Sequence, residues 1–376
     1  MGFTEVDSED AVAEAVVSVL ERDNVRDSTL WPKLAESGLL SVALLERCGE
    51  DTGLLEVSAM LTELGTDAVQ VPALATLGFG VLPLAQTAPK SLTQRIFRAV
   101  AQGAILTAAL NEPGSPFVAT PKTAAVLGGG SVRITGHKVC VPYAESARWI
   151  LVPTDRGVAV VESCTPGVRC VRSPGVSSAP EYSVYFEQAE IPAEQLLIDG
   201  AAPLQRLAVA TIGSVADGLL KGLLRVLTEH IRIHRQFGLA PAAFNAARRE
   251  FEEVHDVSRL LQTALRSAIQ LLLQRDDHPQ YDERVRDELG TLAHWITAQL
   301  PAAMSKCHRL HGGPTTAEPF HRYYAQAQDL VRWLGDQSIP MFSPPGEGPA
   351  LPSLRPAADT ETGDLMAGVA VAGRRT

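Results

Sequence analysis

The chain has 376 residues, of which 45% are hydrophobic and 20% charged, a balance typical of a folded globular protein rather than a disordered one. Its formal net charge of −10 argues against nucleic acid as a partner, because phosphate binding normally needs a clustered basic face. The acidic N-terminal segment has no basic leader of a secretory signal, and we see no apolar run near the roughly 20 residues of a membrane span.

Residues 1–107 are predicted to form a helical domain. Apolar residues recur every three or four positions, as expected for helices with one buried face. The first such stripe is made of Val12, Val16, Val19 and Leu20. Two glycines that follow apolar stretches, Gly38 and Gly65, are the predicted helix stops.

Residues 108–202 are predicted to form a β-barrel domain. Here short runs of β-branched and aromatic residues are separated by glycine and proline, which is typical of strands joined by turns. Such strands are expected around 131–141, 149–154, 157–163 and 182–192. An antiparallel barrel or sandwich is the natural packing for them.

Residues 203–338 are predicted to form a helical bundle, because the helical period returns in long segments. One helix carries a continuous apolar face made of Leu219, Leu220, Leu223, Leu224 and Leu227. Segments of this length favour a four-helix bundle. The tail, 339–376, is rich in proline, glycine and alanine and is predicted to be loosely ordered. The fold class is therefore mixed but mainly α.

The five cysteines are scattered without a CxxC pair, which fits a reducing compartment. We therefore expect a cytoplasmic protein. The histidines lack the spacing of metal ligands, so no metal site is predicted.

Several local strings, in this order of domains, resemble the acyl-CoA dehydrogenase family. LNEPGS at 110–115 is similar to the T-E-P-G segment of that family, and ITGHKVCVPY at 134–143 to its G-x-K-x-x-I-T-N strand. HRQFG at 234–238 resembles its R-x-Q-F-G turn. RLHGGP at 309–314, with HRYYAQA at 321–327, resembles its Q-x-H-G-G turn and R-Y-Y-R-D-A helix.

The resemblance implies FAD, placed between the β domain of one subunit and the bundle of its neighbour. A Gly-Gly turn permits close backbone approach, and exposed amide groups suit the diphosphate. The residues expected to contact FAD by this resemblance are His234, Arg235, Gln236, Phe237, Arg309, His311, Gly312 and Gly313. His234 stands where the family has arginine, and Arg309 stands where it has glutamine.

Members of this family desaturate a CoA thioester, and a glutamate removes the α-proton. It occupies one of two positions in the family, at which this chain has Leu334 and Ala208, or Gln205 if the second alignment slides by three residues. None of these is acidic, so no catalytic residue is assigned. The nearest carboxylates are Asp336 and Asp217.

The flavin-ring segment also departs from the family, because Pro142 and Tyr143 replace its threonine and asparagine. This combination resembles the non-catalytic subunit of actinobacterial heteromeric (α2β2) acyl-CoA dehydrogenases. The resemblance implies FAD shared with a catalytic partner subunit, the acyl-CoA substrate on that partner, and an electron-transfer flavoprotein as acceptor. It also implies CoA thioesters of steroid side chains as a substrate class.

Three alternatives remain open at this point. The first is a self-sufficient homotetramer that uses a displaced acid such as Asp336. The second is a scaffold that binds no flavin. The third is a flavin monooxygenase, which needs an intact ring site, and the altered segment at 138–143 argues against it.

Overall fold

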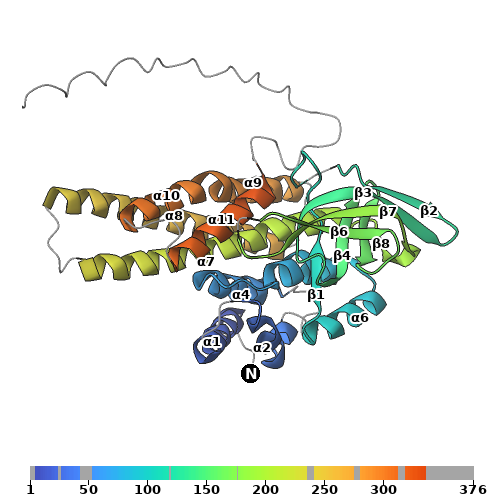
Figure 1. Cartoon of the computed structure of the whole chain (residues 1–376), viewed down its shortest axis with the longest axis horizontal. Coiled ribbons are helices and arrows are strands. Elements are labelled where there is room, and N and C mark those ends of the chain that lie inside the picture. Colours follow the sequence, from blue (N-terminus) through green and yellow to red (C-terminus); the bar gives the residue numbers. More distant parts are fainter. Residues whose placement is uncertain are drawn as a thin grey trace, which may run out of the picture. The chain divides into compact units, whose positions relative to one another are not determined.

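Helices occupy the first part of the chain, strands the middle and long helices the last part, in the order expected from the sequence (Figure 1). The computed structural model describes residues 5–23, 27–42, 53–117, 120–175, 177–234, 241–274, 280–311 and 318–335. The predicted tail at 339–376 lies outside these ranges, and so does Asp336.

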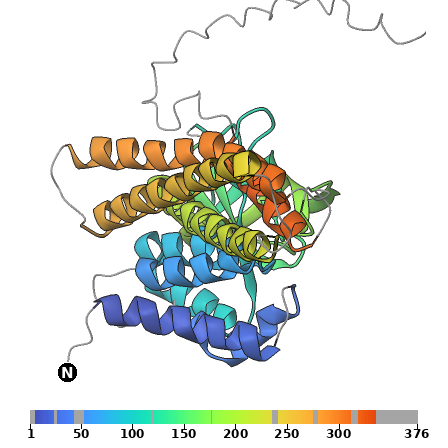
Figure 2. The ribbon, with the colours of Figure 1, turned by 90° about the vertical axis from the view of Figure 1, so that its left-hand side faces the viewer.

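The helices before the first strand pack around α4. Their bounds are Glu5–Asp23 (α1), Leu30–Glu36 (α2), Leu39–Val42 (α3), Leu54–Thr66 (α4), Leu74–Val81 (the π-helical segment η1), Leu82–Thr87 (α5) and Lys90–Ala101 (α6). The predicted stripe of α1 is buried, from Val12 at 6% exposed to Val16 at 0%. Figure 2 shows α4 between α1 and the long helices, and α4 packs along α7 (Ala201–His234).

The two predicted helix stops behave differently. Gly38 follows α2 with a φ of 78°, a left-handed conformation that suits glycine, so this stop is confirmed. Gly65 does not end a helix, because α4 continues to Thr66. A Cβ at Gly65 would lie 2.7 Å from the carbonyl oxygen of Val215. Glycine at this position therefore allows α4 to pack closely against α7, because it has no Cβ.

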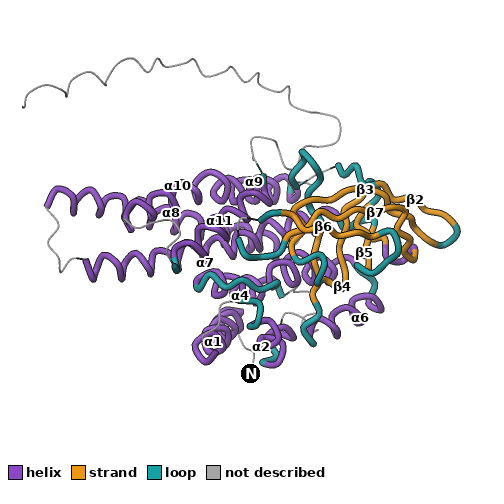
Figure 3. Tube along the Cα trace, viewed as in Figure 1, coloured by secondary structure: helices purple, strands orange, loops and turns teal. Residues whose placement is uncertain are grey.

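The strands form two four-stranded sheets (Figure 3). Their bounds are Ile105–Ala108 (β1), Ala124–Gly128 (β2), Ser131–Pro142 (β3), Ala147–Thr154 (β4), Gly157–Glu162 (β5), Val168–Ser173 (β6), Glu181–Pro192 (β7) and Leu196–Leu197 (β8), with a 3₁₀ turn η2 at Ala193–Gln195. The strand orders are β1-β4-β5-β8 and β2-β3-β7-β6. The two sheets share one core, which includes Ile134, Val152, Val161 and Val184.

One strand pair differs from the antiparallel pairing expected. β1 and β4 run parallel, whereas the other named pairs are antiparallel. The β2–β3 hairpin lies between β1 and β4 in sequence, which gives the chain the length a parallel connection requires. This crossover brings the end of β3 next to β1.

Long helices complete the chain and run side by side in Figure 1. They are α7, α8 (Pro241–Gln274), α9 (Tyr281–His294) with a π-helical segment η4 (Trp295–Gln299), α10 (Leu300–His311) and α11 (Phe320–Leu334). Of the predicted apolar face of α7, Leu219, Leu220, Leu223 and Leu227 are fully buried and Leu224 is half-buried.

By length and composition alone, residues 201–230 of α7 could cross a membrane, although the sequence showed no uninterrupted apolar run of that kind. The most apolar window of this helix is 89% buried inside the protein, as in the core helix of a bundle. The feature is therefore weak evidence for a membrane span.

Candidate functional site

The positions at which a catalytic glutamate is expected lie in apolar surroundings. Leu334, the last residue of α11, is 1% exposed, and Ala208 in α7 is 0% exposed. Both belong to the main hydrophobic core. Gln205, one turn before Ala208, is half-buried. None of the three side chains can remove a proton from carbon, because a general base needs a carboxylate or a similar acceptor.

Two buried carboxylates do lie beside the end of α11, but both are bound to Arg332. The Arg332 Nη1 and Nη2 groups donate to the two oxygens of Glu181 at 2.6 and 2.5 Å, and Nη2 also donates to Asp329 at 2.7 Å. Trp333 Nε1 donates to Glu181 at 2.7 Å. We name Glu181, Asp329, Arg332 and Trp333 the Arg332 cluster. It joins α11 to the first residue of β7.

One cation, Arg332, serves both carboxylates of the Arg332 cluster. Burial opposes the charge of Arg332, but the hydrogen bonds to Glu181 and Asp329 outweigh it and raise the pKa of Arg332 above its usual value. The two parallel N–H···O bonds to Glu181 have the geometry of the strongest arginine–carboxylate pairs. The oxygens of Glu181 are therefore occupied by Arg332 and Trp333, and Asp329 is bonded to Arg332 as well.

Two of the sequence strings that carry the resemblance meet as a buried ion pair. Lys138, in β3, donates to Glu112, of the LNEPGS segment, at 2.8 Å, and the two side chains are 0% and 3% exposed. Glu112 also accepts from the backbone of Lys122 and from the backbone and hydroxyl of Thr123, at 2.7–3.0 Å. Burial alone would raise the pKa of Glu112, but these donors lower it to about 2.

Several other polar groups at the end of β3 are bonded within the chain. The Thr107 hydroxyl donates to the carbonyl of Pro142 at 2.7 Å, and the Tyr143 amide donates to Pro180 at 2.8 Å. Cys140 Sγ accepts from Arg332 at 3.3 Å, and burial raises the pKa of the Cys140 thiol. Pro142 has no N–H at all.

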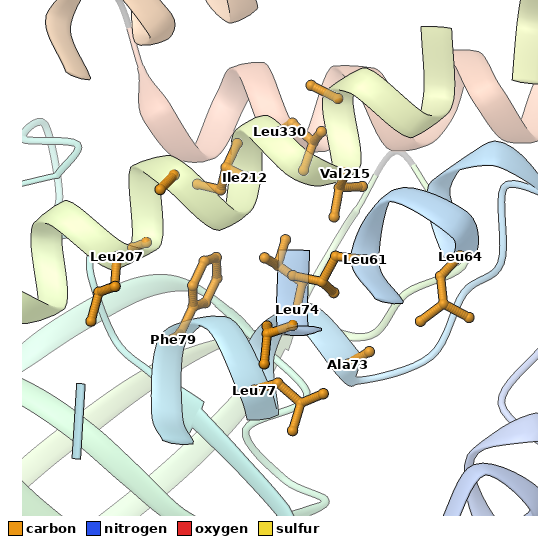
Figure 4. Packing of buried hydrophobic residues seen from close by; sticks show 14 of the residues in the cluster. Leu61, Leu64, Ala73, Leu74, Leu77, Phe79, Leu207, Ile212, Val215 and Leu330 are labelled. Atoms are coloured by element: carbon orange, nitrogen blue, oxygen red, sulfur yellow. The ribbon is translucent and has the colours of Figure 1, made fainter. Parts of the chain in front are cut away.

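A cavity of about 60 Å³ lies between α4, the start of η1, the end of β3 and α11. Its lining includes Leu61, Leu74, Val215 and Leu330, which lie close together in Figure 4. It has room for about two water molecules, whereas pockets for drug-sized ligands measure roughly 300–1,000 Å³. This cavity is therefore too small to hold a flavin ring.

Of the residues expected to contact FAD, Arg309 and His311 are described, both in the last turn of α10. Arg309 is exposed and lies 3.4 Å from Glu250. The His311 ring contacts the ring of His230 at 4.5 Å between centroids and that of Phe320 at 5.5 Å. This end of the bundle therefore offers rings in tilted contact and a cation.

The other expected contacts are untested by the structure. Only the backbone of His234, at the end of α7, is described, and Arg235, Gln236, Phe237, Gly312 and Gly313 lie outside the described residues.

The sequence interpretation missed three rings at this end of the bundle. His230 precedes His234 by four residues and so shares a helix face with it, a signal that was present in the sequence. The Phe320 ring contacts the ring of His311 and also that of His308, whose centroid is 5.7 Å away, in tilted arrangements. His308 Nδ1 is buried without a hydrogen-bond partner. We name His230, His308, His311 and Phe320 the ring cluster.

Comparison with characterised sequences identifies relatives that match most of the chain. Acyl-CoA dehydrogenase FadE28 of Mycobacterium tuberculosis (strain ATCC 25618 / H37Rv) is 40% identical over 342 residues, which are 90% of this chain and 96% of the relative. Acyl-CoA dehydrogenase FadE27 of the same organism is 28% identical over 321 residues, 82% of this chain and 85% of the relative. No family model matches the chain.

Solved structures agree on the fold. The ChsE4–ChsE5 complex from Mycobacterium tuberculosis contains a chain with a TM-score of 0.77 and 24% identity, covering 90% of this chain and 96% of that one. The Tcur3481–Tcur3483 steroid ACAD G363A variant gives a TM-score of 0.79 at 23% identity, covering 89% and 96%. At these identities the likeness concerns the fold alone.

Proposed function

The chain belongs to the acyl-CoA dehydrogenase family, and on this premise we propose that it is the non-catalytic subunit of a mixed, FAD-dependent acyl-CoA dehydrogenase. The assembly would carry out α,β-desaturation of a CoA thioester. The base and the acyl-CoA would lie on a catalytic partner subunit in an α2β2 arrangement. FAD, when bound in the assembly, accepts the hydride that leaves the β-carbon.

The observation that carries this proposal is the chemistry of the base positions. Leu334 and Ala208 are buried among apolar side chains, and two buried carboxylates on the same helices, Asp329 and Asp217, are each paired with a cation. Asp329 is held by Arg332 at 2.7 Å, and Asp217 by Lys221 at 2.7 Å. Burial raises the pKa of Asp217, since it outweighs the attraction of Lys221. In our proposal Asp217 is a structural carboxylate, because it forms its ion pair with Lys221 one turn further along the same helix.

The comparisons support a mixed assembly by analogy. Two of the solved structures with this fold are described as pairs of differently named proteins, ChsE4 with ChsE5 and Tcur3481 with Tcur3483. The second is described as a steroid ACAD. We extend both properties to this chain as part of the proposal: a catalytic acyl-CoA dehydrogenase partner, and steroid side-chain CoA thioesters as the substrate class.

This chain would contribute the end of its bundle to the partner's FAD. Arg309 offers a cation, and the ring cluster beside His311 offers flat surfaces on which an adenine can stack. His234, Arg235, Gln236, Phe237, Gly312 and Gly313 would complete the contact. An electron-transfer flavoprotein as acceptor and a cytoplasmic location belong to the same proposal.

The direct test is co-expression of this chain with a catalytic subunit encoded beside it, followed by purification of the complex. We expect bound FAD and acyl-CoA oxidation in the mixed complex and neither in this chain alone. His311→Ala and Gly312→Asp should lower the FAD content of the complex. His255→Ala, an exposed histidine of α8, is the matched control and should leave it unchanged.

Two outcomes would contradict the proposal, and each favours an alternative. A yellow, active protein from this chain alone indicates a self-sufficient dehydrogenase with a displaced acid. A stable mixed complex without flavin, with FAD supplied during purification, indicates a scaffold that serves assembly only.

A further inference from the structure

The end of α11 is fastened to the β domain from two sides. On one side, Arg332 and Trp333 reach Glu181 at the start of β7, while Arg332 also contacts Cys140 in β3. On the other side, a Cβ on Gly335 would lie 2.2 Å from Pro116 Cγ, so the chain leaving α11 touches the loop after Glu112 directly.

We propose that the Arg332 cluster is a latch that closes the interface between β3 and α11, so that this chain cannot take a flavin ring between its own strand and helix. This inference rests on the proposed function, in which the β3–α11 interface corresponds to the flavin-ring site of the family. In this inference, Arg332 and Glu181 are the residues that keep the flavin ring out.

The latch is costly to open because it pairs Arg332 with two buried carboxylates. The side chains of Glu181 and Asp329 are 0% and 4% exposed, whereas that of Arg332 is 32% exposed. Withdrawal of Arg332 would leave two carboxylates without a counter-charge in an apolar interior, which is strongly unfavourable. Both oxygens of Glu181 are already engaged by Arg332, and one of them also by Trp333.

The space behind the latch is filled as well. Trp333 packs edge-on against Phe79, with ring centroids 6.2 Å apart and an interplanar angle of 75°. The cavity that remains beside Trp333 and Tyr143 is about 60 Å³. A tricyclic ring would have to displace Trp333 from both Phe79 and Glu181.

The test uses the full-length chain purified without a partner and lumiflavin, the flavin ring without ribityl phosphate or adenine. We expect no saturable quenching of lumiflavin fluorescence up to about 100 µM, the range in which a preformed ring site would bind. Saturable binding to the unchanged chain would overturn the proposal.

Closure itself is read from the reactivity of Cys140, measured as its alkylation rate by peptide mass spectrometry. Because Arg332 lowers the pKa of the Cys140 thiol, each rate is divided by the thiolate fraction obtained from the pH dependence of the same reaction. Arg332→Gln should raise this normalised rate at least about tenfold, because the contact of Arg332 with Sγ is lost and the interface opens. Arg248→Gln is the matched control, since Arg248 pairs with Glu252 at 2.8 Å on the exposed face of α8. Equal rates in Arg332→Gln and the unchanged chain would overturn the proposal.

If Arg332→Gln fails to fold, Arg332→Lys keeps one charge in place and should give an intermediate rate of Cys140 alkylation. A rate equal to that of the unchanged chain would again contradict the latch. The two proposals fail separately. A mixed complex without FAD would contradict the proposed partner role but would not contradict the closed interface. Binding of lumiflavin to the unchanged chain would contradict the closed interface but would not contradict the partner role.

Discussion

Lys138 of β3 and Glu112, in the loop that follows β1, form a 2.8 Å ion pair in which both side chains are buried. The pair ties together the two sequence strings at 110–115 and 134–143. With Thr123 and the amide of Lys122 also donating to Glu112, the carboxylate is surrounded by donors. The Lys138–Glu112 pair therefore holds β3 against the loop that follows β1.

Lys138→Met should destabilise the protein by about 3–5 kcal/mol, because removing one partner leaves a buried charge uncompensated. Urea unfolding followed by circular dichroism measures this loss. Adding Glu112→Gln to Lys138→Met should recover part of it, since glutamine carries no charge and still accepts from Thr123. A loss below 1 kcal/mol for Lys138→Met would contradict the role of the pair.

Glu112 should also make stability depend on pH in the acid range. Its folded pKa, about 2, lies below the ordinary value of 4.5, so its stabilising effect is full above pH 4.5 and is lost as the pH falls toward 2. The loss amounts to about 2–3 kcal/mol across that window. Urea unfolding at pH 5 and pH 3 should show a smaller difference for Glu112→Gln than for the unchanged chain. Equal differences would show that Glu112 is not the group responsible.

The sequence was sufficient to predict the order of helices and strands because periodicity and turn residues act locally. It predicted the stop at Gly38 for the same reason, since a left-handed residue after a helix is a local requirement. It was wrong at Gly65, where the need for glycine arises from contact with Val215, 150 residues further along the chain. A local pattern does not distinguish these two uses of glycine.

Gly218, at the contact between α4 and α7, and Gly290, in α9, provide a matched pair of glycine variants. A Cβ at Gly218 would lie 2.1 Å from the carbonyl oxygen of Thr62, so Gly218→Ala must push the helices apart and should cost about 1–3 kcal/mol. Gly290→Ala, in α9 with nothing within 4 Å of the added Cβ, should stabilise the protein by about 0.5–1 kcal/mol. The melting temperatures of the two variants, each compared with that of the unchanged chain, test both expectations. A destabilised Gly290→Ala or an unaffected Gly218→Ala would contradict this packing.

The candidate site was predictable only in part. The apolar residues Leu334 and Ala208 at the expected base positions could be read from the sequence, because the residue type at an aligned position is local information. The Arg332 cluster was not, since Arg332 and Glu181 are 151 residues apart and no local pattern marks them as partners. Of the ring cluster, only the spacing of His230 and His234 gave a local signal.

Leu334→Glu should not turn this chain into a dehydrogenase. The new carboxylate would enter a site 1% exposed, beside a cavity too small for a flavin ring. We expect the purified variant to lose thermal stability and to reduce an artificial acceptor with acyl-CoA at less than about a hundredth of the rate of the mixed complex. A high rate of acceptor reduction by the purified variant alone would contradict the proposal that the β3–α11 interface is closed to a flavin ring.

The central claim is that this chain supplies no proton acceptor to the reaction. The most direct measurement is kcat of the active mixed complex after Asp336→Asn and Asp217→Asn are introduced into this chain. The account predicts a kcat within about twofold of the unchanged complex, whereas loss of a general base lowers rates by about 10²–10⁴-fold. A fall of that size with the complex intact and FAD still bound would contradict it.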